Sequence, residues 1–307
     1  MDALDTVFDA MRVRSVLHAR LEASAPWGLS FNGSPRAKFG LVARGACWLD
    51  AEGQDQPIAL TGGDCFILLH DRPFSIRDTP KTPTVPCAEV IQNRTGEVIE
   101  FGGGSQVTTL ISGWFEFDEL GARPLLDALP PIIHTRMDCD QSRTLQSTFQ
   151  LLATETAEHR LGSSLVVSRL ADILFIHTIR AYLNDDGAPR DGWLAAMSDR
   201  QIGETVRAIH EDIAAPWTVE KLAARAAMSR SAFAARFKEL VGQPPMDYLA
   251  RWRMYQASSL IRYNAAGLAD IAESIGYESE IAFARAFKRV TGSTPNEYRR
   301  QHNAQVS

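Results

Sequence analysis

Two short segments near the end of this 307-residue chain carry basic and small side chains at a spacing suited to contacts with a nucleic acid. If each segment is helical, one face combines long hydrogen-bond donors with small side chains that allow close approach to base edges. Arg285 could pair in bidentate fashion with a guanine, whereas Lys238 and Lys288, nearer the helix ends, suit phosphates. The candidate DNA-binding residues are Arg230, Ser231, Ala234, Ala235, Lys238, Glu280, Ile281, Ala284, Arg285 and Lys288.

The pattern that would position these residues occurs twice, at an offset of 50 positions. Phenylalanines at i and i+4 in each copy place both rings on one side of a helix, so the opposite side is exposed. A serine before each helix is a typical N-cap, and a small residue just before it suits the tight turn of a helix-turn-helix unit. The phenylalanines and serines are Phe233, Phe237 and Ser229 in the first copy and Phe283, Phe287 and Ser279 in the second; the small residues are Ala227 and Gly276, at an offset of 49. A solvated helix face is the alternative for any single residue, but the duplicated unit favours DNA binding.

Between the two copies, residues 245–261 predict a long helix opened by Pro244 and Pro245. A rigid connector would let the two recognition helices enter successive major grooves of one duplex, about 34 Å apart. The arginines of this connector, Arg251, Arg253 and Arg262, could touch phosphate or could pair with local acids.

Charge is distributed unevenly along the chain. Residues 201–307 hold 14 Lys and Arg and 11 Asp and Glu, a net of +3, and subtraction from the totals of 32 and 37 leaves 18 and 26, a net of −8, for the first 200. Only the C-terminal part therefore suits a polyanion. No apolar run reaches about 18 residues, and the N-terminus lacks the basic start of a signal peptide, so we expect a soluble, cytoplasmic protein with no membrane partner.

Residues 30–117 have the pattern of short strands separated by Gly, Pro and Asp, which predicts a small antiparallel barrel or sandwich. From residue 142 the period becomes helical, with a break near Leu161 and Gly162. The apolar stripes of these helices could cover the barrel or pair with a second subunit. We predict an α+β chain with a first domain at 1–185, a polar linker at 186–200 and an all-α domain at 201–307.

Cysteine and histidine spacing argues against a metal site or other cofactor. The cysteines, at positions 47, 65, 87 and 139, lie far apart, which predicts reduced and mostly buried thiols. No His-x-His occurs, and His70 stands alone, so His70 and His134 are interpreted as structural or surface groups. We expect no enzyme activity; the alternatives are a metal-dependent cupin enzyme with a DNA-binding tail and an alkylation-repair protein with a zinc-bound cysteine.

Residues 202–300 resemble the DNA-binding domain of the AraC/XylS family of bacterial transcription regulators. The resemblance rests on Trp217-Thr218-Val219, Ile271 to Tyr277, Ser279, Phe283, Ala286 to Arg289, Gly292, Pro295 and Tyr298-Arg299. It implies base-reading positions at Ser231, Ala234 and Ala235 and at Ile281, Ala284 and Arg285. Ala235 departs from the arginine often found there, so we expect the first helix to contribute mainly apolar contact and backbone positioning.

The first two hundred residues resemble the cupin-type sensor domain of one AraC subgroup. The matching residues are Gly45 to Leu49, Gly63-Asp64, Gly113 to Phe115, Leu125 to Pro130 and Leu170 to Phe175. Phe39-Gly40 and Pro73-Phe74 stand where cupin-like relatives often carry histidine. The resemblance implies a cupin-like antiparallel β-barrel with a helical dimerisation segment. It also implies a small-molecule effector, a homodimer, RNA polymerase as partner, and activation rather than repression.

A barrel without metal can hold a small molecule in its mouth. Five side chains in or beside the predicted strands could line a pocket for an anionic or aromatic effector, or could be solvated basic groups beside a core tryptophan. They are Lys38, Arg44, Trp48, Arg72 and Arg77. With both interpretations open, the effector-binding residues stay unassigned.

Overall fold

The computed structural model describes Leu4, Phe8, Met11 and residues 13–34, 36–69, 72–92, 98–135, 143–158, 160–185, 192–263 and 266–303. His70 and Cys139 lie outside these ranges. The chain forms two compact units. The sheet unit comprises Val13–Glu116 and Pro130–Ala188, and the helical unit comprises Met1–Arg12, Phe117–Leu129 and Pro189–Ser307.

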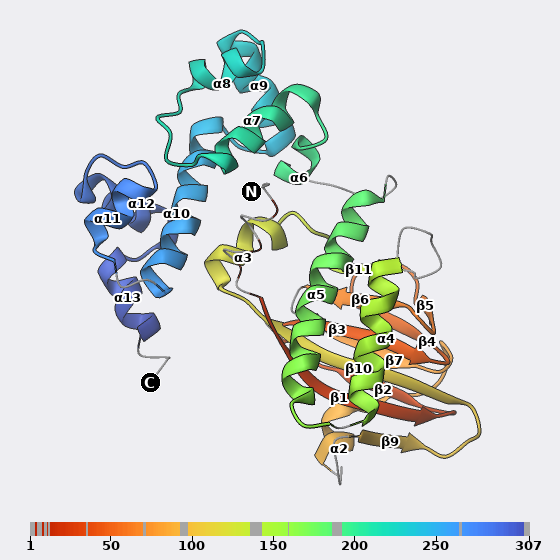
Figure 1. The fold of residues 1–307 in the computed structure, drawn as a ribbon. Helices are drawn as coiled ribbons and strands as arrows, with labels where there is room; N and C mark the ends of the chain where they lie inside the picture. Colours follow the sequence, from red (N-terminus) through yellow and green to blue (C-terminus); the bar gives the residue numbers. More distant parts are fainter. Residues whose placement is uncertain are drawn as a thin grey trace. The chain divides into compact units, whose positions relative to one another are not determined.

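The strands of the sheet unit form two sheets (Figure 1). The six-stranded sheet has the order β11 (Ile132–Thr135), β6 (Cys65–Leu68), β3 (Ala37–Arg44), β10 (Val107–Glu116), β1 (Arg14–Ser24) and β9 (Val98–Gly102). The five-stranded sheet has the order β5 (Ile58–Thr61), β4 (Ala46–Ala51), β7 (Phe74–Arg77), β2 (Gly28–Phe31) and β8 (Val85–Pro86). Neighbours pair antiparallel except β1 with β9 and β2 with β8.

A closed barrel is not confirmed, because no strand pairing joins the two sheets within the described ranges. The chain passes from one sheet to the other through corners such as Gly45, between β3 and β4. Gly45 has a φ of +84°, and a Cβ there would lie 2.7 Å from the Val107 carbonyl oxygen. Since L-residues with side chains rarely adopt this φ, the corner requires glycine.

The core of the sheet unit lies between the two sheets. Alternation along β4 buries Cys47, Leu49 and Ala51 against it, as expected for a strand with one covered face. Trp27, which is 2% exposed, belongs to this core, and α2 (Cys87–Gln92) adds Cys87 to it. Burying such apolar side chains is the main favourable contribution to folding.

Helices α4 (Arg143–Glu158) and α5 (Ser163–Asn184) pack against each other, and α5 covers the six-stranded sheet (Figure 1). The predicted break is confirmed: Gly162, with φ +82°, precedes α5. Phe175 packs on Phe115, with ring centroids 4.8 Å apart. The amide of Ser15 donates to Asp172 Oδ1 at 2.7 Å, which ties α5 to β1.

The helical unit contains helices of 5 to 19 residues. They are α3 (Glu119–Leu126), α6 (Gly192–Ala196), α7 (Arg200–Glu211), α8 (Val219–Arg225), α9 (Arg230–Val241), α10 (Pro245–Tyr263), α11 (Leu268–Ser274), α12 (Glu280–Thr291) and α13 (Pro295–Asn303). Helix α6 lies inside the range predicted as linker, and its Trp193 is buried. Within the described ranges, no helix has the length and apolar character needed to cross a membrane.

Candidate nucleic-acid interface and ligand pocket

Helices α8 and α9 form the first predicted helix-turn-helix unit. Helix α8 is followed by Ala227, whose φ of +52° makes it the one residue other than glycine with positive φ in the described part of the chain. The Ser229 hydroxyl then accepts a hydrogen bond from the Ala232 amide at 3.3 Å, which caps α9 as predicted. Gly242, with φ +83°, ends α9.

Helices α11 and α12 repeat this geometry. The turn contains Gly276 at φ +83°, and Ser279 caps α12 by accepting from the Ala282 amide at 3.3 Å. Gly292, with φ +84°, ends α12. The predicted caps and turn residues are therefore confirmed in both units.

The phenylalanine pairs anchor both helices as predicted. All four rings are fully buried, and the centroids lie 5.6 Å apart for Phe233 and Phe237 and 5.7 Å for Phe283 and Phe287. In each unit the second ring also contacts a tyrosine at a matching position: Phe237 meets Tyr248, and Phe287 meets Tyr298. Because one face of each helix is packed inside, the other faces solvent.

The ten predicted DNA-binding residues all lie on the outward faces of α9 and α12. Eight are exposed, and Ala234 and Ala284 are half-buried. Ile281 is 68% exposed, which is unusual for a large apolar side chain. Each helix-turn-helix unit thus presents an accessible face with exposed residues at matching positions.

Ion pairs hold two arginines of α9. The Arg230 guanidinium lies 2.8 Å from Glu220 of α8, with both side chains largely exposed. Arg236 lies 2.6 Å from Asp199, whose pKa is lowered mainly by the Ile202 amide hydrogen bond and further by Arg236. Arg236 therefore joins α9 to the start of α7, a contact that sequence spacing does not reveal.

Of the three connector arginines, Arg262 pairs with a local acid, as one of the two predicted alternatives has it. Arg253 donates to the carbonyls of Ile213 and Ala215, each at 2.9 Å. Arg262 donates to the Asp118 carboxylate at 3.0 Å. Both are thus engaged inside the helical unit, whereas Arg251 is exposed.

A buried histidine supports the first unit only. His210 of α7 is 4% exposed, and its Nε2 lies 2.7 Å from the Tyr248 hydroxyl. Its ring centroid lies 4.2 Å from that of Trp252. Burial lowers the pKa of His210 to about 3, so the ring is neutral near pH 7.

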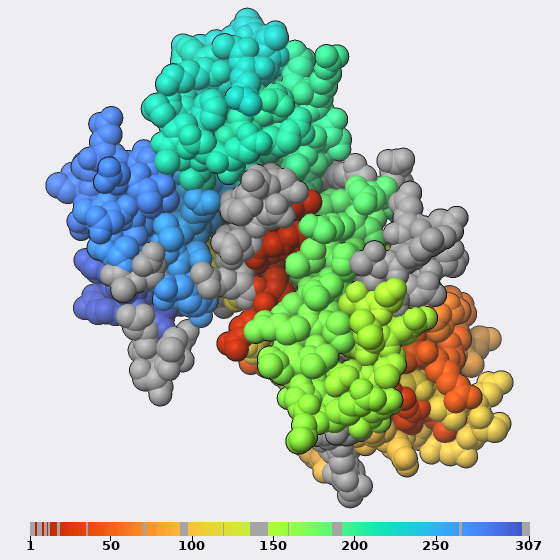
Figure 2. All heavy atoms as spheres, in the orientation of Figure 1, coloured from red at the N-terminus to blue at the C-terminus, as the bar shows by residue number. Residues whose placement is uncertain are grey.

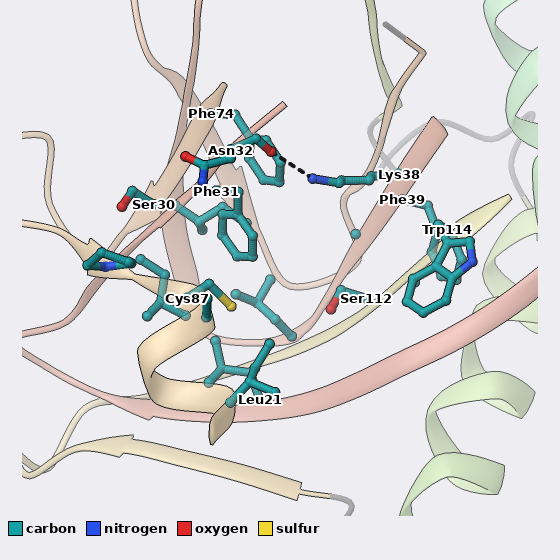
Figure 3. Close-up of a pocket in the computed structure, with 18 of the residues that line it drawn as sticks. Leu21, Ser30, Phe31, Asn32, Lys38, Phe39, Phe74, Cys87, Ser112 and Trp114 are labelled. Atoms are coloured by element: carbon teal, nitrogen blue, oxygen red, sulfur yellow. Dashed lines mark hydrogen bonds between the residues drawn. The ribbon is translucent and has the colours of Figure 1, made fainter. Parts of the chain in front are cut away.

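The sheet unit contains a cavity of about 320 Å³, lined by strands of both sheets and by α2 (Figure 3). Its walls are mainly apolar. They comprise Leu21, Leu29, Ser30, Phe31, Asn32, Lys38, Phe39, Gly40, Phe66, Phe74, Ile76, Pro86, Cys87, Ala88, Ile91, Leu110, Ser112, Gly113 and Trp114. Cavities of this size and character can enclose a small organic molecule.

Lys38 is the single charged side chain among the described residues that line this cavity. Its Nζ donates to the Asn32 carbonyl at 3.1 Å, as Figure 3 shows, and lies 5.0 Å from the Phe74 ring centroid. Phe74 stacks on Phe31 with centroids 4.4 Å apart. The cavity therefore offers aromatic faces and one cation to a ligand.

Of the five side chains considered for a pocket, Lys38 lines this cavity and the other four do not. Arg72 donates to the Glu52 carbonyl at 3.1 Å, and Arg77 lies 3.3 Å from Asp50. Sequence reasoning missed Phe31 and Ser112 as lining residues, because the cavity forms where two sheets separate. No local periodicity marks such a place.

The three described thiols are buried at separate positions of the sheet unit. Cys47, Cys65 and Cys87 are free and buried, as predicted, and burial raises the pKa of Cys87 to about 11. In the described part of the chain, no three His, Cys, Asp or Glu side chains cluster to hold a metal ion.

Comparison with known proteins matches two separate parts of the chain to two different family models. A cupin family model matches residues 2–184, and a helix-turn-helix domain model matches residues 222–301. A Streptomyces lividans protein named as an AraC-like transcription regulator is 39% identical, over 98% of each chain. A Streptomyces antibioticus protein of the same description is 37% identical, over 98% of this chain and 99% of its own. The crystal structure of the DNA-binding domain of AdpA with a target DNA is 35% identical over 35% of this chain and 96% of its own, with a TM-score of 0.34.

Proposed function

Because the chain belongs to the AraC family of DNA-binding transcription regulators and has a cupin-type N-terminal domain, we propose that it is an effector-responsive transcription activator and not an enzyme. In this proposal α9 and α12 read promoter DNA, and the cavity of the sheet unit binds the effector. RNA polymerase is the further partner, and the cytoplasm is the site of action. Activation and these last two assignments rest on the family.

The observation that carries the DNA-reading proposal is the matched presentation of α9 and α12. Each helix buries two phenylalanines on one side and exposes small and basic side chains on the other. We assign base readout mainly to α12, where Arg285 is exposed and suited to guanine O6 and N7. Lys238 and Lys288 are assigned to phosphates, because both lie near the ends of their helices.

Ala235 gives α9 a different role. It occupies the position 50 residues before Arg285 and offers no hydrogen-bond donor from its side chain. Ser231 and Ala234 are also small, so α9 can approach the groove floor closely. We therefore assign α9 to apolar contact and positioning of the protein on the duplex.

The cavity favours a compact apolar or aromatic molecule that carries one anionic group. Its aromatic walls would bury the apolar part, and Lys38 would pair with the anion. Binding would favour one arrangement of the chain over another, since a ligand acts only through its different affinity for two states.

We assign the exposed apolar side chains of α4 and α5 to a homodimer interface. Leu151 is 60% exposed, Leu165 62%, Val166 44% and Ile173 43%. Figure 2 shows both helices, in yellow-green and green, as a continuous part of the molecular surface. A second copy would cover this face symmetrically, as in most homodimers. Ile173→Glu should shift sedimentation toward monomer, whereas Lys221→Glu, which introduces the same carboxylate at an exposed position of α8, should not.

Selection of bound duplexes from a random library tests the DNA-reading proposal. The full-length protein should enrich a motif with two conserved segments about one helical turn apart. Its affinity should fall steeply as salt concentration rises. Failure to enrich any motif over a range of salt concentrations would contradict the proposal.

Binding of naphthoate, an aromatic carboxylate, tests the cavity assignment. Calorimetry should detect binding to the full-length protein, and Lys38→Met should weaken it about tenfold, since charge-assisted contacts are roughly twice as strong as neutral ones. Arg72→Met is the matched control, because Arg72 is exposed and does not line the cavity. Equal loss in both variants, or no binding at all, would refute a site for this class of ligand.

A further inference from the structure

The segment Phe117–Leu129 connects two strands of the six-stranded sheet but packs with the helical unit. It leaves β10 at Glu116 and leads to β11, which begins at Ile132. Its helix α3 packs on α10, the connector between the two helix-turn-helix units (Figure 1). We call Phe117–Leu129 the coupling segment.

A buried ion pair fixes the beginning of the coupling segment. Asp118 Oδ2 accepts from Arg262 Nη1 at 3.0 Å, and the Asp118 side chain is fully buried. Its Oδ1 caps α3 by accepting from the Gly121 amide at 3.0 Å. Because removing one partner of a buried pair leaves an uncompensated charge, this contact ties α3 firmly to the last turn of α10.

The rest of α3 is attached at two further places. Leu120 packs against the core of the second helix-turn-helix unit, which includes Phe287. Toward its other end, the Pro124 carbonyl accepts from the Trp193 indole at 2.8 Å. Trp193 in turn contacts Trp252, in the first half of α10. The coupling segment thus contacts residues that support both helix-turn-helix units.

The same segment is linked directly to the ligand cavity. Ser112, Gly113 and Trp114 of β10 line the cavity, and three residues separate Trp114 from Asp118 (Figure 3). A ligand that displaces this end of β10 would pull on the N-cap of α3 and on its ion pair. Extended backbone transmits such a displacement over three residues with little slack.

We propose that the coupling segment transmits occupancy of the β10 cavity to α10 through the Asp118–Arg262 ion pair, and so adjusts how α9 and α12 are presented. The proposal rests on the proposed function for its biological meaning. Its physical content, a two-state linkage between the cavity and α10, can be tested without DNA or the natural effector.

Hydrogen exchange on the full-length protein tests this linkage. Ser112→Phe places a ring in the cavity as a substitute for a ligand, and Asp118→Asn removes the charge but keeps an oxygen that can cap α3. Asp127→Asn is the matched control, because it makes the same change at an exposed position of the coupling segment. The double variant Ser112→Phe with Asp118→Asn completes the cycle.

We expect Ser112→Phe to change amide exchange in α3 and in the last two turns of α10. Asp118→Asn alone should speed exchange there by about tenfold or more, and in the double variant the effect of Ser112→Phe on α10 should disappear. Asp127→Asn should leave the response intact.

The linkage is refuted if Ser112→Phe alters exchange only in the sheets, or if its effect on α10 persists with Asp118→Asn. Trp114→Phe, which enlarges the same cavity, repeats the test if Ser112→Phe does not fold. Selection of bound duplexes separates the two proposals. Absence of a sequence preference would contradict the proposed function, but it would not change the hydrogen-exchange result on the linkage.

Discussion

Helices α9 and α12 have the same length of 12 residues, serine caps, glycine ends and paired buried phenylalanines, yet they expose different side chains. At the matching positions α9 has Ser231 and Ala235 where α12 has Ile281 and Arg285. The buried residues that position each helix are thus separate from the residues that the helix exposes, to which we assign DNA reading. One unit can therefore specialise in base readout while the other positions the protein.

The two units also differ in how their scaffolds are supported. The first turn uses Ala227 at φ +52°, whereas the second uses Gly276 at φ +83°. Tyr248 of the first unit bonds to buried His210, whereas Tyr298 of the second lies beside His302, a half-buried residue of α13. These differences predict that the units respond differently to mutation and to acid.

The largest expected effect is common to both units. Phe237→Ala and Phe287→Ala should each lower the free energy of unfolding by about 3–5 kcal/mol, because each leaves a cavity in a fully packed core. Denaturant unfolding measures the loss, and Ile281→Ala on the exposed face should change it by about 0.5 kcal/mol or less. If the free energy of unfolding fell by less than about 1 kcal/mol for either variant, the two units would not depend equally on their buried phenylalanines.

The turns should respond in opposite directions. Gly276→Ala should cost about 2–4 kcal/mol, since alanine is strained at this φ and its Cβ would lie 2.4 Å from the Ala214 carbonyl oxygen. Ala227→Gly should relieve strain and stabilise the protein by at most about 1 kcal/mol. Thermal unfolding of the two variants checks the signs. Destabilisation by both would show that Ala227 is not strained.

Acid should weaken the first unit more than the second. The pKa of His210 is about 3 in the folded protein against 6.5 as its ordinary value, so the unfolded chain takes up the proton first as pH falls. The contribution of neutral His210 is fully present above about pH 6.5 and is lost toward pH 3, by up to about 1.4 kcal/mol per pH unit. At pH 5 the loss is about 2 kcal/mol.

Amide exchange in α9 and α12 at pH 5 and pH 7, corrected for the intrinsic rates, measures this difference. At pH 5, amide exchange in α9 should be faster, relative to exchange in α12, than it is at pH 7. His210→Gln, which cannot take up a proton, should abolish this relative increase. Equal responses in the two helices would contradict the assignment of acid sensitivity to the first unit.

The last comparison concerns DNA binding by the arginines of the two exposed helix faces. Arg285→Ala should weaken binding to the preferred sequence by about 1–3 kcal/mol and relax preference at one base pair. Arg230→Ala should weaken binding to all DNA sequences equally, by about 1 kcal/mol or less, because Arg230 is exposed and paired with Glu220. Competition binding with single-base variants separates the two results. A specificity change from Arg230→Ala would place base readout on α9 as well.

The sequence predicted those features that depend on neighbouring residues. Phe233 and Phe237 lie four positions apart, and Ser229 lies just before its helix, so local geometry suffices to infer the buried side and the cap. Gly162 likewise marks the break between α4 and α5 because glycine tolerates positive φ.

Features that depend on distant residues were not predictable in the same way. Asp118 meets Arg262 across 144 positions, and no local pattern marks the coupling segment as part of the helical unit. The cavity depends on how two sheets separate, so Lys38 could not be distinguished from Arg72 or Arg77 in advance. Closure of the strands into a barrel also depends on long-range pairing, and in the described ranges the strands form two sheets that no pairing joins.

Protection of guanine N7 from methylation on a selected duplex tests the central claim most directly, that both recognition helices present their outward faces to one DNA. The wild-type protein should protect two major-groove segments about 10 base pairs apart, and Arg285→Ala should expose one guanine in a single segment. Protection of one segment only, or an unchanged pattern with Arg285→Ala, would contradict the claim.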